Sequence, residues 1–355
     1  MKKRVLVGMS GGVDSSAAAL VLLRAGYEVS GVTMILHNNG EEDPSLCGSS
    51  REAEDAAAVC RHLGISHQVL DFSSIFAEYV QKNFITEYTA GRTPNPCIRC
   101  NRYLKFGAML EYALKNGFDY VATGHYALVE EENGRFLLRR APTDKDQSYV
   151  LYQLSQHQLS HILTPLGRME KPEIRRLAEE AGLPVAHKAE SQDICFIPDG
   201  DYNGFLARET GREPEPGDFV DLQGHVLGRH RGITRYTIGQ RKGLGLSFGQ
   251  PMYVTKIDPA LNQVTLGPEG SQYAPGLLAS DVNWIAFDQP TEPFDSQVKV
   301  RYRAGAAPAR VFPLEDGKVR VEFMEPQRSI TPGQAAVFYL GDVVAGGGTI
   351  LSPLP

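Results

Sequence analysis

The amino-terminal part of the chain alternates short apolar runs with a longer amphipathic stretch. Residues 5–9 and 29–36 are rich in apolar side chains, and residues 14–24 carry apolar side chains at helical spacing before Gly26. Short apolar runs are typical of strands buried on both faces, and a glycine just after a periodic stretch is a helix stop signal. This pattern predicts one strand–helix–strand unit.

The same alternation continues along the chain. It predicts strands over residues 67–71 and 120–123, and helices over residues 51–63, 75–88 and 103–116. Strands that alternate with helices indicate an α/β fold with a doubly wound, mostly parallel sheet, whose ligands lie at the carboxyl ends of the strands. Because residues 10–15 and 123–125 each follow a predicted strand, we expect both segments at that edge.

The pattern changes in the carboxyl-terminal half. A helix over residues 174–181 ends the α/β pattern, Gly and Pro become frequent from Gly211, and residues 213–217 are typical of a linker. Four short runs separated by turn residues then predict a small antiparallel β-barrel: residues 298–302, 309–312, 319–323 and 335–339. We therefore expect three domains, over residues 1–210, 211–276 and 277–355.

Composition places the chain among ordinary globular proteins. It has 355 residues, of which 42% are hydrophobic and 22% charged. The first apolar run is too short for a signal peptide, and no run approaches the ~20 residues that span a bilayer. We expect a cytoplasmic protein without a membrane partner. In that reducing compartment its five cysteines are expected to be thiols, metal ligands or catalytic groups rather than disulfides.

Charge is distributed unevenly. The net charge of −6 argues against a general nucleic-acid coat, but residues 88–110 and 225–257 carry basic side chains and no Asp or Glu. Such segments can neutralise phosphates, although solvated basic faces are common. In the second segment, Arg241 and Lys242 between glycines form a compact group suited to gripping phosphate.

Residues 10–15, Ser-Gly-Gly-Val-Asp-Ser, carry the strongest chemical signal. Glycines let backbone N–H groups approach phosphate oxygens, serines add donors, and a helix N-terminus adds partial positive charge. The spacing is not that of a Walker A loop, because no lysine follows the glycines. Asp14 predicts a Mg²⁺-bridged polyphosphate, since a bare carboxylate would repel one. The alternative is a tight turn without a ligand.

Six further motifs accompany this loop. They are Gly91-Arg-Thr-Pro-Asn-Pro-Cys-Ile-Arg-Cys-Asn101, Ala122-Thr-Gly-His-Tyr126, Lys145-Asp-Gln-Ser-Tyr149, Asp193-Ile-Cys-Phe-Ile197, Thr237-Ile-Gly-Gln-Arg-Lys-Gly-Leu-Gly245 and Thr331-Pro-Gly-Gln334. The loop resembles that of the PP-loop ATP pyrophosphatases, which cut ATP between its α and β phosphates. The loop and the six motifs together make the chain resemble the tRNA-specific 2-thiouridylases over essentially its whole length.

The resemblance implies a fold and an activity. The fold would be a PP-loop domain followed by a small central domain and a C-terminal β-barrel. The activity would use ATP and Mg²⁺ to adenylate the C2 oxygen of a wobble uridine in tRNA, release pyrophosphate, and put sulfur in place of that oxygen. Implied partners are the tRNAs for Glu, Gln and Lys, and a sulfur donor such as a cysteine desulfurase or a sulfur-relay protein.

The resemblance also implies residue roles. Positions that bind ATP match Gly8, Met9, Ser10, Gly11, Gly12, Val13, Asp14, Ser15, Met34 and Gly124. Positions that touch tRNA match Asn95, Pro96, Cys97, His125, Lys145, Asp146, Gln147, Arg301, Tyr302 and Gln334. Cys100 matches the first catalytic cysteine and Cys195 the persulfide carrier, whereas Cys47 and Cys60 are expected to be non-catalytic.

Chemistry gives separate support for two cysteines. A uracil C2 oxygen activated with AMP calls for a soft, ionised sulfur nucleophile, and a second thiolate releases that sulfur by disulfide exchange. From the residues alone, Cys195 is as well explained as a buried core cysteine. His125 is interpreted as a hydrogen-bonding residue, and we assign it no proton transfer.

One position departs from the family pattern. Cys97 stands where the better-known branch has an acidic residue, so the chain presents Cys97 and Cys100 plus the distant Cys195. Three thiolates with an open site can hold a 4Fe–4S cluster, whereas a zinc site normally needs a fourth ligand. The slightly favoured interpretation is the cluster, and the persulfide cycle is the alternative.

Two other function classes remain. Another PP-loop enzyme, such as an amidotransferase-type synthetase acting on a small metabolite, has no use for Cys100, Cys195 and an RNA-binding barrel. A non-catalytic RNA-binding or cluster-scaffold protein has no use for Asp14 in an intact loop. Uridine-dependent release of pyrophosphate distinguishes thiolation from both.

Overall fold

The computed structural model describes residues 2–37, 49–188 and 194–355. They form two compact units. The first contains Met1–Gln81, Pro96–Gly200 and Asp342–Val344, and the second contains Lys82–Asn95, Asp201–Gly341 and Ala345–Pro355. Within the described ranges, no helix has both the length and the apolar character needed to cross a membrane.

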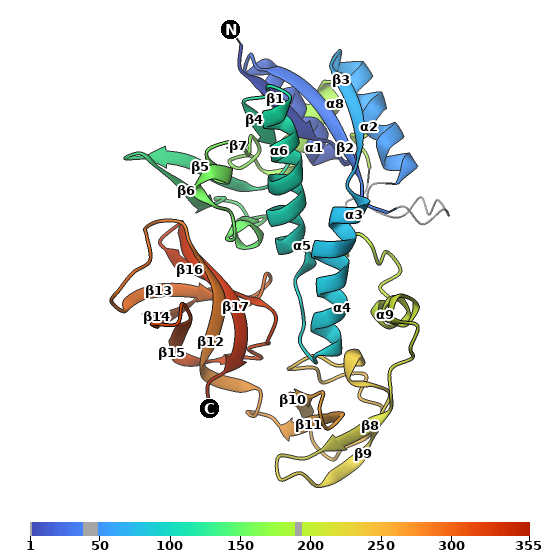
Figure 1. Ribbon diagram of the computed structural model, residues 1–355, viewed down its shortest axis with the longest axis vertical. Coiled ribbons are helices and arrows are strands. Elements are labelled where there is room, and N and C mark those ends of the chain that lie inside the picture. The colour runs from blue at the N-terminus through green and yellow to red at the C-terminus, as the bar shows by residue number, and fades with distance from the viewer. Residues whose placement is uncertain (1, 38–48, 189–193) are drawn as a thin grey trace. The chain divides into compact units, whose positions relative to one another are not determined.

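A parallel sheet of order β3-β2-β1-β4-β7 forms the centre of the first unit (Figure 1). Its strands are β1 (Arg4–Gly8), β2 (Glu28–Ile35), β3 (Ser66–Asp71), β4 (Tyr120–Ala122) and β7 (Ile162–Leu163). Every neighbouring pair in it is parallel. The chain order reverses at β1, which pairs with β2 on one side and β4 on the other. The predicted doubly wound parallel sheet is confirmed.

Helices cover both faces of this sheet. Val5 and Val7 of β1 lie in one buried cluster with side chains of three helices, α1 (Val13–Arg24), α2 (Ser50–Leu63) and α8 (Lys171–Glu180). Alternation along the strand turns Leu6 and Gly8 to the opposite face. There a Cβ atom on Gly8 would lie 3.4 Å from the Met109 sulfur, so helix α6 (Met109–Lys115) covers that face.

Two longer helical segments contain π-helical stretches. The segment α3 (Ser73–Phe76), Ala77–Gln81 and α4 (Lys82–Thr89) confirms the helix predicted over residues 75–88. The segment α5 (Pro96–Arg99), Cys100–Ala108 and α6 begins at Pro96, so the predicted start at residue 103 is wrong. Proline suits a first helical turn, because its missing N–H is not needed there.

Smaller elements of the first unit gave no strong sequence signal. They are the hairpin β5 (Ala127–Glu132) and β6 (Arg135–Arg140), the 3₁₀ turn Ser148–Leu151 and helix α7 (Gln156–Leu159). The hairpin turns at Asn133 and Gly134, which both have positive φ.

The second unit contains a four-stranded sheet of order β10-β11-β8-β9. Its elements are α9 (Tyr202–Thr210), β8 (Gly217–Val220), β9 (Val226–His230), the 3₁₀ turn Ile233–Arg235, β10 (Met252–Asp258) and β11 (Gln263–Pro268). Phe219, Val254 and Leu266 are central to its buried cluster. Helix α4 belongs to this unit and packs on α9 through an edge-to-face contact of Phe84 with Phe205, at 5.8 Å between ring centroids.

The carboxyl-terminal strands close into an antiparallel barrel. They are β12 (Tyr273–Trp284), β13 (Phe294–Lys299), β14 (Ala307–Pro313), β15 (Val319–Arg328), β16 (Ala335–Leu340) and β17 (Val343–Pro353). Their order is β12-β15-β14-β13-β16-β17, and an additional β12–β17 pairing closes the ring. The predicted barrel is confirmed. The domain boundaries expected after residues 210 and 276 stay a prediction.

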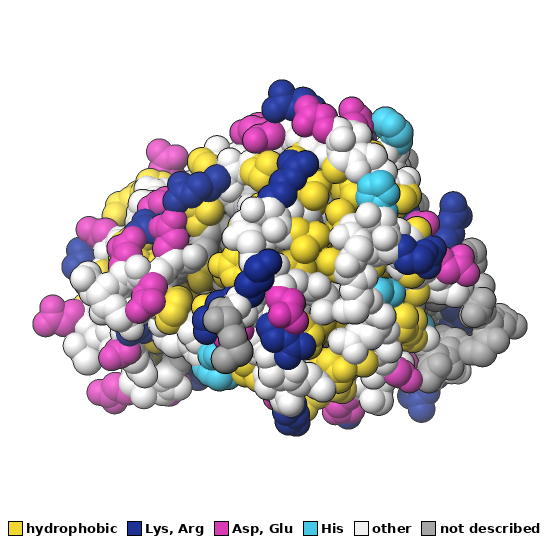
Figure 2. All heavy atoms as spheres, turned by 90° about the horizontal axis from the view of Figure 1, so that it is seen from above, with side chains coloured by type: hydrophobic (Ala, Val, Ile, Leu, Met, Phe, Trp, Pro, Cys, Tyr) yellow, Lys and Arg dark blue, Asp and Glu magenta, His cyan; other side chains and the backbone are white. Residues whose placement is uncertain are grey.

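Charged side chains are mixed on the surface. On the face shown in Figure 2, acidic and basic groups are interspersed among polar and apolar ones. That face offers no broad basic area to a polyanion.

Candidate functional site

The loop after β1 adopts a compact form that its glycines permit. Gly11 has φ +63°, and a Cβ atom there would lie 2.7 Å from the Glu52 carbonyl oxygen. Gly12 is the N-cap residue of α1. The Ser15 hydroxyl accepts from the Ser10 N–H at 3.2 Å and donates to the Gly12 carbonyl at 3.2 Å. These contacts fix the loop at a helix N-terminus, which favours bound anions.

The loop after β4 packs directly on the loop after β1. A Cβ atom on Gly124 would lie 2.8 Å from both the carbonyl carbon and the Cβ of Asp14, so only hydrogen fits there. The Tyr126 hydroxyl, two residues further on, donates to Asp14 Oδ1 at 2.7 Å. Because β1 and β4 are parallel neighbours at the switch in strand order, both loops border the crevice where such sheets bind ligands.

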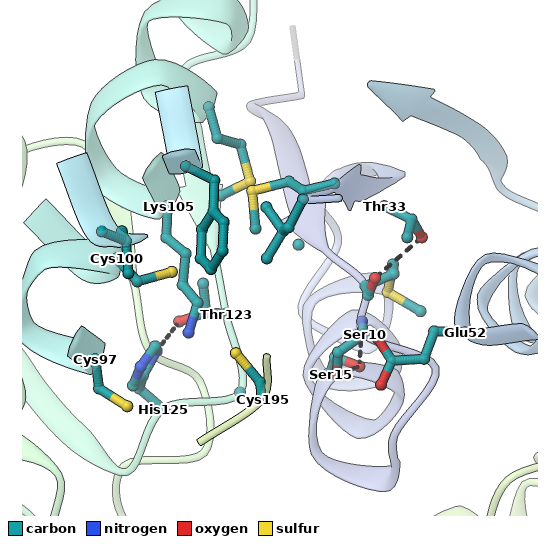
Figure 3. A pocket seen from close by; sticks show the side chains of 18 of the residues that line it. Ser10, Ser15, Thr33, Glu52, Cys97, Cys100, Lys105, Thr123, His125 and Cys195 are labelled. Atoms are coloured by element: carbon teal, nitrogen blue, oxygen red, sulfur yellow. Dashed lines mark hydrogen bonds between the residues drawn. The ribbon is translucent and has the colours of Figure 1, made fainter. Parts of the chain in front are cut away.

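A cavity of about 330 Å³ opens at this edge (Figure 3). The predicted ATP positions that line it are Gly8, Met9, Ser10, Asp14, Ser15, Met34 and Gly124. The predicted RNA and sulfur positions that line it are Pro96, Cys97, Cys100, His125, Gln147 and Cys195. Gly11, Gly12 and Val13 complete the loop and start α1, but they are not among the described residues that line the cavity. The structure thus brings the predicted phosphate loop and the three predicted cysteines around one space.

Two segments supply the cysteines. Cys97 and Cys100 lie three residues apart in a helix, so they occupy neighbouring positions on its surface. Cys97 is exposed, and Cys100 is buried and opens the π-helical stretch, a feature frequent at functional sites. Cys195 is half-buried and comes from a separate segment, as Figure 3 shows. Asp193 of the same motif lies outside the described residues.

The remaining cysteines differ from these. Cys60 is buried in α2, and burial raises the pKa of its thiol to about 11. A thiol with that pKa stays protonated at neutral pH and is a poor nucleophile, which supports its prediction as non-catalytic. Cys47 lies outside the described residues.

The three cavity cysteines do not form a metal-ligand set as placed. Over the described ranges, no three His, Cys, Asp or Glu side chains are grouped closely enough to hold a metal ion. Cys97, Cys100 and Cys195 therefore share a cavity but are not grouped as the ligands of a metal ion. We assign no chemical step to a cluster.

The cavity has different charges at its two ends. Asp14 and Glu52 line it beside the loop after β1. Lys105, the one Lys or Arg of the described lining, reaches toward Thr123 and His125, on the side of Cys97 and Cys100 (Figure 3). A cation near thiols favours their ionised form.

His125 is a buried neutral group. Its Nδ1 lies 2.6 Å from the Thr123 hydroxyl oxygen. Burial holds the pKa of His125 well below its ordinary value, and the charge of Lys105 lowers this pKa further. The ring therefore offers hydrogen bonds and no positive charge, which supports its interpretation as a hydrogen-bonding residue.

The predicted RNA positions near the β5–β6 hairpin differ in their surroundings. Lys145 is exposed. The Asp146 carboxylate accepts from the backbone N–H groups of Ala141 and Ser148 at 3.0 and 3.1 Å, so it stabilises its own turn. Gln147 accepts from the Tyr126 N–H at 3.0 Å through its side-chain oxygen.

In the second unit, two predicted RNA residues are engaged with protein atoms. Arg301 donates through one guanidinium nitrogen to the Ile238 and Ser329 carbonyls, each at 2.9 Å, and to the Thr331 hydroxyl. Gln334 donates to the carbonyls of Thr93 and Pro94 at 2.9 and 3.1 Å. Four further predicted positions vary in exposure: Tyr302, Arg241 and Lys242 are exposed and Asn95 is half-buried.

Sequence reasoning missed several residues of the cavity. They include Thr33, Glu52, Phe76, Lys105 and Met109. Lys105 lies in the acid-free segment of residues 88–110, for which the sequence left open phosphate binding or a solvated basic face. Its place in a helix directly after Cys100 was the signal that pointed to the cavity.

The fold and the loop define a class of protein, the PP-loop nucleotide-binding proteins. Three family models match the chain along its length. They are a tRNA methyl transferase HUP domain at residues 3–199, a tRNA methyl transferase PRC-barrel domain at residues 203–268, and an aminomethyltransferase beta-barrel domain at residues 274–350.

Similar proteins identify the family. The chain is 51% identical to the tRNA-specific 2-thiouridylase MnmA of Acetivibrio thermocellus, with 98% of this chain and 99% of that protein covered. It is 52% identical to the corresponding protein of Pelotomaculum thermopropionicum, with 99% and 98% covered. The chain belongs to the MnmA family of tRNA-specific 2-thiouridylases, and the resemblance found in its motifs is confirmed.

We expect the His125 ring to stay neutral at about pH 6, where a histidine of ordinary pKa ~6.5 is mostly protonated. Because the unfolded chain then binds more protons than the folded one, this residue lowers the free energy of unfolding as pH falls below ~6.5. Side-chain ¹⁵N shifts across a pH series measure the protonation state, and His125→Gln identifies the signal. A His125 midpoint near pH ~6.5 would contradict the buried neutral ring.

Proposed function

We propose that this chain is an ATP-dependent tRNA-uridine 2-sulfurtransferase that converts a wobble uridine to 2-thiouridine. One observation carries the proposal: the anion-binding loop and three cysteines from two segments line the same cavity. An activation step and a sulfur step on one base require this proximity. The printed function of the relatives, tRNA-specific 2-thiouridylase, supports the same conclusion.

ATP and Mg²⁺ belong to the activation step. The uracil O2 attacks the α-phosphorus of ATP, pyrophosphate leaves, and the uracil N3 proton is lost. The loop of Ser10 to Ser15 would hold the phosphates through its backbone N–H groups and hydroxyls. Mg²⁺, when bound, neutralises phosphate charge, and Asp14 and Glu52 are the carboxylates that line the cavity beside the loop.

The sulfur step balances with two cysteines. The terminal sulfur of a Cys195 persulfide attacks C2, and AMP leaves with the original oxygen. The Cys100 thiolate then attacks the Cys195 sulfur, so that a Cys100–Cys195 disulfide forms and the second sulfur stays on C2 as N3 is reprotonated. A thiol reductant resets the disulfide, and a sulfur donor such as a cysteine desulfurase or relay protein reloads Cys195. This is the role that the cavity supports for each cysteine.

Other PP-loop chemistry explains less of the cavity. A synthetase that transfers ammonia to a small metabolite needs the nucleotide loop but not Cys97, Cys100 and Cys195 around the same space. A non-catalytic RNA-binding protein needs neither the nucleotide loop nor the three cysteines. Thiolation uses both sets of residues.

The direct test is to incubate the full chain anaerobically with ATP, Mg²⁺, unmodified tRNA and a persulfide donor. We expect tRNA-dependent release of pyrophosphate, and 2-thiouridine at the wobble position of the tRNAs for Glu, Gln and Lys by nucleoside mass spectrometry. Cys195→Ser should keep the pyrophosphate release and lose 2-thiouridine, because adenylation needs no thiol. No tRNA-dependent pyrophosphate from the wild-type chain would refute the proposal.

The role of Cys97 separates the persulfide cycle from an iron–sulfur cluster. In the persulfide cycle, Cys97→Ala retains substantial activity, and Cys100→Ala loses it. We expect this result, together with an iron-free, colourless anaerobic preparation, because the three thiols do not form a ligand set as placed. A brown preparation with about four iron atoms per chain, lost in all three alanine variants, would establish the cluster instead.

Exposed basic groups of the second unit should bind tRNA phosphates. Arg229 pairs with Asp218 at 2.8 Å and Lys256 with Asp258 at 3.0 Å, whereas no ion pair of Arg241 or Lys242 occurs among the described residues. Reversing Arg241 and Lys242 to Glu should weaken tRNA binding and reduce the log–log salt slope by about one unit per lost phosphate contact. The matched control reverses Arg229 and Lys256, and equal effects of the two double variants would remove Arg241 and Lys242 from the interface.

A further inference from the structure

Two lysines from distant parts of the chain lie against the loop of Ser10 to Ser15, which contains no lysine of its own. The Lys171 ammonium lies 2.6 Å from Asp14 Oδ1. The Lys188 ammonium donates to the Gly11 carbonyl at 3.0 Å and to Asp55 Oδ2 at 2.6 Å. Both ammonium groups therefore lie against the loop.

The position of Lys171 is fixed by the core. It is the first residue of α8, whose Ile174 and Ala178 are buried in the cluster shared with α1. Its side chain is only 11% exposed, whereas the Asp14 side chain is 33% exposed. An ammonium this far from water needs anionic partners, and the loop supplies one.

The Asp14 carboxylate does not depend on Lys171 for a hydrogen bond. Tyr126 already donates to the same oxygen at 2.7 Å. A structural role for Lys171 in orienting Asp14 is thus duplicated by an uncharged donor. What Lys171 adds at this place is positive charge.

Polyphosphate binding requires such charge. In a Walker A loop, a lysine of the loop itself reaches the phosphates. Here the loop carries Asp14, and Glu52 and Asp55 follow nearby in α2, so the local charge would repel a triphosphate without added cations. Lys171 and Lys188 bring two positive charges that offset the negative charge of these carboxylates.

We propose that Lys171 and Lys188 are the phosphate-binding cations of this loop, held at it by Asp14 and Asp55 until the polyphosphate of ATP or free pyrophosphate takes their place. The proposal rests on the ATP binding in the proposed function. It assigns each lysine to binding and neutralising the phosphates, and assigns neither to the thiol chemistry.

Calorimetric titration of the full chain with Mg²⁺-ATP, Mg²⁺-pyrophosphate and adenosine tests this. Lys171→Met and Lys188→Met should each weaken the binding of ATP and of pyrophosphate by about tenfold or more, because each variant loses charge-assisted hydrogen bonds to the phosphates. Adenosine has no phosphates, so its affinity should change less than about twofold. Lys171→Arg should restore much of the loss. Lys3→Met is the matched control, because Lys3 forms an ion pair of the same 2.6 Å length with Asp119 at the other end of β1.

The outcomes are distinct. Unchanged affinity for ATP and pyrophosphate in both methionine variants overturns the proposal, and so does an equal loss for adenosine with a lower melting temperature, which would mark the lysines as structural. If Lys171→Met does not fold, Lys171→Gln and Lys188→Met carry the same test. A wild-type chain that binds no ATP refutes the proposed function itself, whatever the variants do.

Discussion

The site depends on one backbone contact, in which Gly124 lies against Asp14 with no room for a Cβ atom. The contact exists because β1 and β4 are hydrogen-bonded neighbours whose carboxyl ends meet. Sheet geometry, rather than flexible side chains, sets the distance between the two loops. The backbone of the sheet thus positions both loops at the edge of the cavity.

Charge divides the cavity into two ends. Beside the loop, carboxylates such as Asp14 are compensated by ammonium groups from elsewhere in the chain. On the side of Cys97 and Cys100, Lys105 is charged and His125 is neutral because it is buried. The two ends of the cavity therefore differ in charge as well as in the side chains that line them.

The sequence predicted the elements that local patterns control. The first strand, helix α1 and its stop at Gly26 follow from apolar periodicity and glycine placement. The start of the helix at Pro96 was not predicted, because Pro-Asn-Pro is typical of a loop and a π-helical stretch lacks the 3.6-residue period. The contacts of Lys171 and Lys188 span 157 and 177 residues. No local pattern specifies a contact at that separation, so only the fold shows it.

Gln334, a residue predicted to contact tRNA, is already hydrogen-bonded to protein atoms. Its amide group has two N–H donors, and both bonds of its nitrogen go to the carbonyls of Thr93 and Pro94. The Thr93 N–H in turn donates to the Pro332 carbonyl at 2.9 Å. RNA phosphates only accept hydrogen bonds, so Gln334 can bind RNA either through its oxygen, to a 2′-hydroxyl or a base N–H, or by releasing Thr93 and Pro94. The hydrogen bonds of Gln334 and Pro332 therefore fix the backbone of Thr93 and Pro94, the residues that precede helix α5 (Pro96–Arg99) in the chain.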